Sequence, residues 1–430
     1  MTKLKSKRPV KYIAVLLIAG LVFTPGCWDR RELEDQAFVE AIGMDLAKNQ
    51  QFAVTFRIAI PSKTGLGQAG GGGGGGAGSA AEKASLQTTV IAPSLPAAMA
   101  LTSAYVNREL NLMHTKVFIF GESFARQGVG RALNLLSRYR EMRRNIFVCV
   151  AKGEAQKLMS VNAPDLEKSY AKYWEGVRLL TSRLALHPGT LFHDFMLGQE
   201  SIDKAGTMIY LAKNDKSQGQ DPDKLDVPPS FKEGDLSIKA GEIPRLAGDP
   251  LEYLGTAVFK QDKFITTLDY METQAFLILN GTYKMGIHTI KDPKDSKNYI
   301  SPEIKQAAPP QIRVDTTGDT VKISEIVSLE GDLASVQSTQ DYATNFANQH
   351  LLESVLEKHL KEHSLKMLKK MQKSETDIVG FGEYAQRGFL TYQQWKAFNW
   401  SKKFKDAEFD LNFDFKLRRT GLQGKQPGPI

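Results

Sequence analysis

Cysteine is scarce in this sequence: 430 residues contain only Cys27 and Cys149. Two cysteines cannot form the several crosslinks of a disulfide-stabilised scaffold, so that class of protein is excluded. Cys149 lies in an apolar run, residues 146–150, which predicts a buried strand, and we expect a core residue there and not a reactive thiol. Cys27 has no such surroundings and needs a different explanation.

The sequence also lacks an apolar run long enough to cross a bilayer. Its signal-like run, residues 12–23, would extend only about 18 Å as a helix, whereas a hydrocarbon core is about 30 Å thick. The eleven residues before this run contain five basic side chains and no acid. This order is typical of an export signal peptide, so we predict that residues 1–26 direct export and are then removed.

The residues that follow the apolar run, Thr24-Pro25-Gly26-Cys27, resemble a bacterial lipobox. A small residue directly before the cysteine lets the modifying enzymes reach the thiol, although Thr24 stands where leucine is usual. We expect cleavage before Cys27 and a diacylglyceryl group on its sulfur, because two acyl chains anchor a protein stably where one does not. The alternative is ordinary secretion, with Cys27 as an incidental thiol.

The excess of positive charge is smaller than the total suggests. The formal net charge is +8, but five of those charges lie in the signal segment, which leaves +3 for the mature chain. Nucleic-acid-binding domains are usually strongly basic, so we expect no nucleic-acid partner. A phosphate-binding loop is excluded as well, because the glycine run at residues 70–76 is not followed by the required Lys and Ser or Thr.

Beyond residue 27 the hydrophobic pattern predicts a mixed α/β fold, an α+β arrangement of sheets with flanking helices. A content of 42% apolar and 24% charged residues is ordinary for a globular protein of two or three domains. A flexible glycine-rich loop, residues 63–82, separates the first two expected strands. In this half we expect strands at 52–60, 85–92, 116–120 and 145–151, and helices at 94–110, 128–139 and 165–186.

The second half continues the mixture after a polar segment, residues 214–249, which indicates a domain connection or a surface excursion. A long amphipathic helix, residues 341–373, is followed by a Trp-rich helix. We predict three domains: 27–204, 205–300 and 301–430. The expected strands are 255–259, 263–268, 283–290, 311–314, 321–329 and 408–417, with a helix at 269–280. One buried stripe of the long helix should contain Tyr342, Phe346, Leu356, Leu360, Met367 and Met371.

One short pattern on the long helix is shared with zinc hydrolases. The segment from His359 to His363 fits H-x-x-E-H, which places two histidines one helical turn apart beside an acid. A catalytic zinc needs a third protein ligand, and the sequence identifies none. We therefore interpret both histidines as partly exposed helix-surface residues, and we assign no catalytic, cofactor-binding or metal-binding residue to the chain.

A second candidate is an arginine-rich stretch, in which four of six arginines lie between residues 138 and 144. Such a stretch can bind lipid headgroups or an acidic protein. The interpretation we favour is a solvated helix end with local ion pairs, for example to Glu141. Trp395 and Trp400 are similarly interpreted as packing anchors between helix and sheet. The six arginines are Arg126, Arg131, Arg138, Arg140, Arg143 and Arg144.

Several segments, taken in order, resemble the Ger(x)C family, the lipoprotein C subunits of nutrient germinant receptors in spore-forming Bacillota. The likeness covers nearly the whole mature chain. Its most specific part is the opening, Gly-Cys-Trp-Asp-Arg-Arg-Glu-Leu-Glu at residues 26–34, which continues through residues 41–45. Other segments keep the family order: 114–117, 124–128, 140–144, 148–151, 255–260, 272–273, 377–382, 395–396, Trp400 and 420–421.

The resemblance implies a non-enzymatic subunit with three mixed α/β domains. It would act beside two integral membrane subunits, A and B, at the inner (cytoplasmic) membrane of the dormant spore, anchored by lipid on Cys27 and facing away from the cytoplasm. We therefore expect a role in nutrient-triggered germination through binding and assembly. The alternatives are a solute-binding lipoprotein of a transporter and a zinc hydrolase that uses His359 and His363.

Overall fold

The computed structural model describes residues 12–13, 32–60, 85–162, 164, 166–167, 169–215, 225 and 227–420. Cys27, nearly all of the expected signal peptide and the glycine-rich loop at 63–82 lie outside these residues. No helix in the described ranges is both long enough and apolar enough to cross a membrane.

The first sheet has nine strands in the order β3-β2-β1-β5-β6-β7-β8-β9, with β4 paired to β1. Its centre is parallel, from β1 through β5 and β6 to β7, and antiparallel strands extend it on both sides. The strands are β1 (Gln36–Leu46), β2 (Phe52–Ala59), β3 (Ser85–Ala92), β4 (Glu109–Asn111), β5 (Val117–Gly121), β6 (Phe147–Ala151), β7 (Thr207–Lys213), β8 (Leu251–Lys260) and β9 (Lys263–Leu268).

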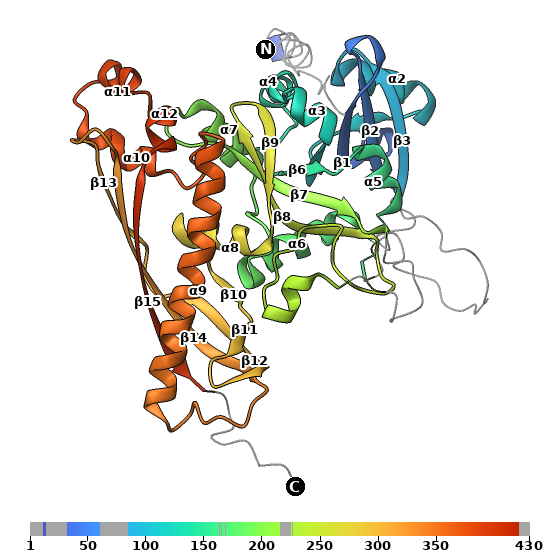
Figure 1. The fold of residues 1–430 in the computed structure, drawn as a ribbon. Helices are drawn as coiled ribbons and strands as arrows, with labels where there is room; N and C mark the ends of the chain where they lie inside the picture. Colours follow the sequence, from blue (N-terminus) through green and yellow to red (C-terminus); the bar gives the residue numbers. More distant parts are fainter. Residues whose placement is uncertain are drawn as a thin grey trace, which may run out of the picture.

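Helices cover both faces of this sheet, as its parallel centre requires (Figure 1). Every residue of β5 and β6 is buried, because the side chains on both faces of these strands pack under helices. Cys149 on β6 is fully buried, and burial raises the pKa of its thiol, so the prediction of a core residue is confirmed. One face carries α2 (Leu95–Val106), α3 (Glu122–Gln127), α4 (Gly130–Arg138) and α7 (Phe192–Glu200), and the other carries α5 (Ala155–Val161) and α6 (Tyr170–Leu184).

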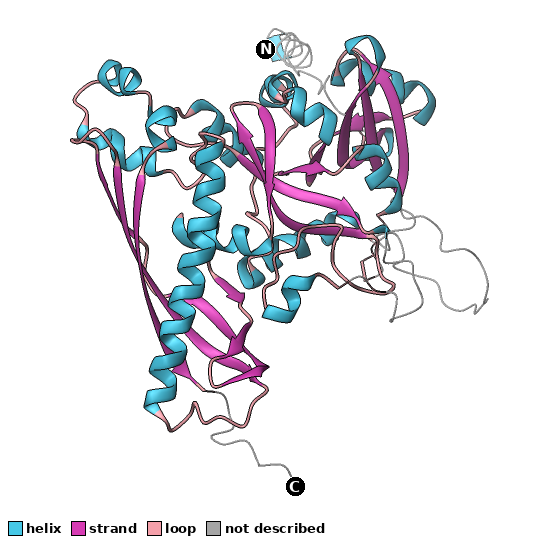
Figure 2. Ribbon diagram, viewed as in Figure 1, coloured by secondary structure: helices cyan, strands magenta, loops and turns pink. Residues whose placement is uncertain are grey.

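The second sheet has six strands in the order β10-β12-β14-β13, with β11 paired to β12 and β15 paired in parallel to β14. Side chains along β14 alternate between buried and exposed, because only one face of this sheet is covered (Figure 2). The strands are β10 (Met285–Ile287), β11 (Ile290–Asp292), β12 (Asp295–Gln306), β13 (Gln311–Asp315), β14 (Lys322–Val336) and β15 (Glu408–Arg419). The covering helices are α9 (Phe346–Lys373), α10 (Phe381–Ala385), α11 (Tyr392–Phe398) and α12 (Trp400–Lys405).

The mixed α/β fold is confirmed, but the expected elements did not include β1 and β7, and the bounds of others differ. The long helix begins at Phe346 and not at residue 341, because the Asn345 side chain accepts hydrogen bonds from the amides of Ala347 and Asn348 and caps it. Phe346 is 72% exposed, so its place in the buried stripe was wrong. Tyr342 is buried, but it precedes the helix.

The segment at 205–300 contributes to both sheets. Strands β7, β8 and β9 continue the first sheet, whereas β10, β11 and the start of β12 belong to the second. The polar segment at 214–249 connects two adjacent antiparallel strands, β7 and β8. The division into three domains stays a prediction. The first sheet runs across the expected boundary after residue 204, and strand β12 of the second sheet runs across the boundary after residue 300.

Glu325 is an acid inside the second core. It lies on the covered face of β14 between Ile312 of β13 and Leu411 of β15, it is fully buried, and neither carboxyl oxygen has a hydrogen-bond partner. Burial, and then the charge of Asp377, raise the pKa of Glu325 to about 9. The carboxyl group is therefore protonated at neutral pH, which avoids the large cost of a buried unpaired charge.

Replacing Glu325 with Gln tests this assignment. Between pH 4.5, the ordinary pKa, and about 9, the folded wild type keeps a proton that the unfolded chain loses. The wild type should therefore lose stability relative to Glu325→Gln as the pH rises through this window, by at most about 1.4 kcal/mol per pH unit. Melting temperatures across the window measure the difference. A similar trend in the control Glu330→Gln, a partly exposed position on the same strand, would contradict the assignment.

Candidate functional site

Helix α8 (Tyr270–Leu279) lies between the two sheets, and all ten of its residues are buried. Its first residues, Tyr270 and Met271, pack into the core of the first sheet, and residues 275–279 pack into the core of the second. Figure 1 shows α8 between β8 and α9. We call each sheet with its covering helices a body. A helix that is buried on every side belongs to the interior, so α8 joins the two bodies.

Three consecutive polar side chains of α8 each have an internal partner. The carboxylate of Glu272 accepts a hydrogen bond from Nζ of Lys370 on α9 at 2.6 Å and another from the amide of Asp269, which completes a capping box. The Thr273 hydroxyl bonds that of Thr256 on β8 at 3.0 Å. Gln274 Oε1 accepts a hydrogen bond from the Tyr283 hydroxyl at 3.0 Å.

Asp269, the N-cap of α8, is affected by this crowding of acids. Burial, followed by the nearby charge of Glu272, raises the pKa of Asp269 to about 6. Lys366 on α9 lies 3.9 Å from its carboxylate, with a side chain that is 54% exposed. Two lysines of α9 therefore face two acids at the start of α8. Lys370 and Glu272 are in close contact, and Glu272 is buried, whereas Lys366 is more distant from Asp269 and more exposed.

A second polar connection joins the two bodies beside α8. Asp377 accepts hydrogen bonds from the amides of Gly380 and Gly382 and from the indole of Trp400, and burial raises its pKa to about 6. Its backbone carbonyl accepts the amide of Ala205, just before β7, at 2.7 Å. Gly382 lies so close to the backbone of Asp203 that a side chain would not fit.

The two tryptophans complete this connection. Trp395 donates its indole N–H to the carboxylate of Asp203, as Trp400 does to Asp377, and both rings are buried and packed against each other. They are packing anchors, as the sequence predicted, and they also satisfy two buried acids. We call residues Asp203, Asp377, Gly382, Trp395 and Trp400 the aspartate–tryptophan connection.

The two histidines of the H-x-x-E-H pattern lie on α9 and are partly exposed, as predicted, but they face a third. His288, from the turn between β10 and β11, packs edge-on against His359 with ring centroids 5.9 Å apart, and His359 and His363 are 4.5 Å apart. Burial lowers the pKa of His359 to about 4 and lowers those of His288 and His363. Within the described ranges, no group of three His, Cys, Asp or Glu side chains is placed to hold a metal ion.

Two hollows have charged side chains among their lining residues. One, of about 320 Å³, opens beside the connection, with Phe276 and Leu277 of α8 and the charged Asp194, Lys204 and Glu383 among its lining residues. Asp194 already accepts the amide of Leu191 at the start of α7. The hollow has the volume for a small solute, but Asp194 is already used at the start of α7, and Glu383 lies in the first turn of α10.

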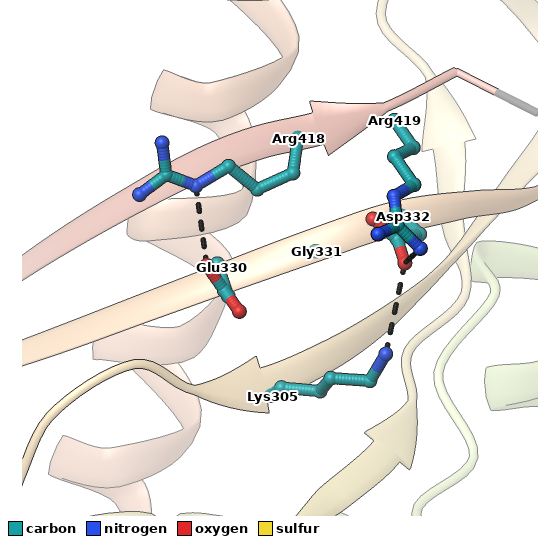
Figure 3. Close-up of a pocket in the computed structure, with 6 residues that line it drawn as sticks. All are labelled: Lys305, Glu330, Gly331, Asp332, Arg418 and Arg419. Carbon is teal, nitrogen blue, oxygen red and sulfur yellow. Dashed lines mark hydrogen bonds and ion pairs between the residues drawn. The ribbon is translucent and has the colours of Figure 1, made fainter.

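The other hollow, of about 270 Å³, lies over β12, β14 and β15 (Figure 3). Arg418 pairs with Glu330 at 3.1 Å, and Lys305 pairs with Asp332 at 3.6 Å. Arg419 also reaches Asp332, at 3.9 Å. The cations that line this hollow therefore already have acidic partners. They form a row of surface ion pairs, and such pairs contribute little to stability.

The arginine-rich stretch divides into two parts. Arg126 pairs with Glu122 on α3 at 2.8 Å, and Arg131 lies over the ring of Phe52. The four arginines between residues 138 and 144 are exposed. The partner suggested for them, Glu141, instead accepts a hydrogen bond from the amide of Leu112 at 3.2 Å.

The sequence pointed to some of these residues and not to others. The helix expected at 269–280 is observed as α8, and the D-x-x-E spacing of Asp269 and Glu272 at its start is a capping-box signature. His288 and Asp203 carry no local signal, because their partners lie 71 and 192 positions away.

Replacing Lys370 with Met tests the junction at α8. The change leaves the carboxylate of Glu272, whose side chain is 4% exposed, without its cation, and should lower the free energy of unfolding by about 2 kcal/mol. Lys366→Met is the matched control, since it removes only a distant and exposed partner, and should cost less than about 0.5 kcal/mol. Urea unfolding of the mature chain measures both. Equal costs for the two variants would be inconsistent with this role of Lys370.

A change of His359 to Gln tests the histidine cluster. As the pH falls from about 6.5 to about 4, the unfolded chain binds protons that the folded cluster does not, so the wild type loses stability across this window. The variant lacks one of these histidines, so its melting temperature should fall less over the same range. His350→Gln, at an exposed position on the same helix, is the control and should follow the wild type. If His359→Gln also follows the wild type, His359 does not titrate as described.

Comparisons with known proteins cover almost the whole chain. The spore germination protein N-terminal domain matches residues 29–211, and the spore germination B3/GerAC-like C-terminal domain matches residues 254–421. Spore germination protein KC of Bacillus subtilis (strain 168) is 25% identical, over 96% of each chain. Spore germination protein B3 of the same organism is 22% identical, over 98% of this chain and all of its own.

A solved structure shares the fold. The crystal structure of the GerBC protein aligns with a TM-score of 0.52 at 17% sequence identity, covering 90% of this chain and 99% of that one. The second family domain contains most of β8, all of β9 and the whole second sheet. The junction residues Glu272, Asp377 and Trp400 also fall within it. The chain belongs to the Ger(x)C family of spore germination proteins.

Proposed function

We propose that this chain is the lipid-anchored C subunit of a spore germinant receptor, required for nutrient-triggered germination, and that it binds and assembles with integral membrane subunits A and B. The observation that carries the proposal is the end-to-end match: both family domains are present in order, and the relatives named for spore germination align over nearly their full lengths.

The described structure supports a binding role without catalysis. The polar groups buried around α8 and in the aspartate–tryptophan connection bond one another and the backbone, so they hold the two bodies together. The two histidines of the zinc-like pattern lie on α9, whose neighbouring residues pack into the second core. They face a third histidine, His288, that lies between β10 and β11. We propose that this subunit contributes contact surfaces and not a reaction centre.

Anchoring through Cys27 is the second part of the proposal. The signal-like segment and the tetrapeptide ending at Cys27 support it, and two acyl chains hold a protein stably at a bilayer. We infer that the chain is held at the inner membrane of the spore, on the side away from the cytoplasm.

The receptor role and the anchoring can both be tested in a spore-forming strain in which this gene belongs to the only receptor that responds to the corresponding nutrient. Deletion should abolish germination by that nutrient, and the wild-type gene should restore it. The Cys27→Ala gene should give protein outside the membrane fraction, without the mass of a diacylglyceryl group, and should restore germination poorly. Cys149→Ala is the matched control, since it removes the other thiol and leaves the anchor in place.

The two parts can fail separately. Normal nutrient germination after deletion would argue against the receptor role, whatever the state of Cys27. Protein that stays in the membrane fraction with an acylated mass after Cys27→Ala would argue against the anchoring site alone. Co-purification of transporter subunits and a bound small molecule, in place of receptor membrane subunits, would favour the solute-binding alternative.

A further inference from the structure

Four exposed arginines form a compact cationic segment that begins at the last residue of α4. We define the arginine segment as Arg138, Arg140, Arg143 and Arg144, all of which are exposed. None of them has an ion pair with a residue in the described part of the chain, whereas Arg126 pairs with Glu122 and Arg245 pairs with Glu252, both at 2.8 Å. The segment therefore presents several guanidinium groups that are available to an external anion.

The fold places this segment at the end of the first sheet where the described mature chain begins. Strands β1, β5 and β6 are parallel, so the segments that enter them lie at one end, and residues 139–146 enter β6. Glu141, in the middle of the segment, accepts the amide of Leu112, directly after β4. Strand β4 in turn pairs with the first residues of β1, from Gln36 to Phe38.

The length of the chain limits how far this end can be from the anchor. From Cys27 to Glu32, the first described residue of the mature chain, a fully extended backbone spans at most about 18 Å. A diacylglyceryl group on Cys27 would therefore hold the start of η1 (Leu33–Asp35) within about that distance of the headgroups. The arginine segment lies at the same end of the sheet, so a bilayer is the large surface that the anchor brings to it.

The local charges decide what kind of contact this is. Glu34 and Asp35 lie on η1 at the same end, so the face as a whole is of mixed charge. Screening at physiological ionic strength limits attraction between exposed charges to about 8 Å, so only direct contact is effective. Guanidinium groups suit such contact, because their paired N–H donors match the oxygens of a phosphate.

We propose that the arginine segment docks on the phosphate groups of anionic phospholipids in the membrane to which Cys27 anchors the chain. The inference rests on the proposed anchoring and adds a second attachment point to it. An acyl anchor alone fixes the position of the chain but not its orientation. Anchor and arginine segment together hold the amino-terminal end of the first sheet against the bilayer and set the direction in which the second sheet extends.

Vesicle binding tests the segment without the contribution of the lipid. The probe is the mature chain, residues 27–430, with Cys27→Ala, and the vesicles are pure phosphatidylcholine or phosphatidylcholine with about a quarter of phosphatidylglycerol. Co-sedimentation should occur with the anionic vesicles, weaken with salt and be absent with neutral ones. Changing all four arginines to Gln should reduce binding about tenfold or more.

The matched control changes four exposed lysines of the second body to Gln, namely Lys358, Lys369, Lys396 and Lys402, and should keep the binding. Both variants should keep the melting temperature of the parent, because the changed side chains are exposed. Equal loss in the lysine variant, equal binding to neutral vesicles, or full binding by the arginine variant would each overturn the proposal. So would loss of an acidic protein partner on changing the arginines, without any vesicle binding by the parent. None of these results depends on the germination assay.

Discussion

Helix α8 has no face toward water, and the arrangement of the two sheets depends on this constraint. A polar group that leaves water must find a partner inside the protein, or its desolvation is not compensated. Glu272, Thr273 and Gln274 follow one another on α8, so they point in different directions and find partners on different elements. These elements are α9, β8 and the segment before β10. The helix can satisfy all three groups in one orientation only, and that orientation fixes the two sheets relative to each other.

The aspartate–tryptophan connection adds a second attachment between the same bodies. Asp203 precedes the first sheet's β7, and its partner Trp395 belongs to the helices of the second body, while the carbonyl of Asp377 accepts the amide of Ala205. Two separate attachments resist rotation where one would not. Separating the bodies would also expose the apolar residues of α8 on both sides, so they behave as one unit.

The extent to which the sequence predicted this structure follows from the range of the interactions. Local periodicity placed β3 at its observed bounds, residues 85–92, and predicted the mixed fold and the burial of Cys149. It could not assign β7 to β9 to the first sheet, because strand pairing joins segments that are distant in sequence. Local periodicity also did not reveal Glu325, which occupies a buried position of the strand alternation where an apolar residue is expected. Protonation of its carboxyl group removes the cost of burying a charge there. The site was the least predictable part, since Asp203 and His288 have their roles only through distant partners.

A rigid junction has a consequence for a subunit that assembles with membrane proteins. A lipid anchor raises the effective concentration of the chain near its partners, but a flexible second body would still lose conformational freedom on binding. Because α8 belongs to both cores, folding itself orients the two sheets relative to each other. The second sheet is therefore already oriented relative to the first when it meets a partner. Under the proposed function, whatever orients the first sheet on the membrane therefore orients the second as well. The contact surface offered to the membrane subunits is then determined at the junction, although no residue of the junction needs to touch them.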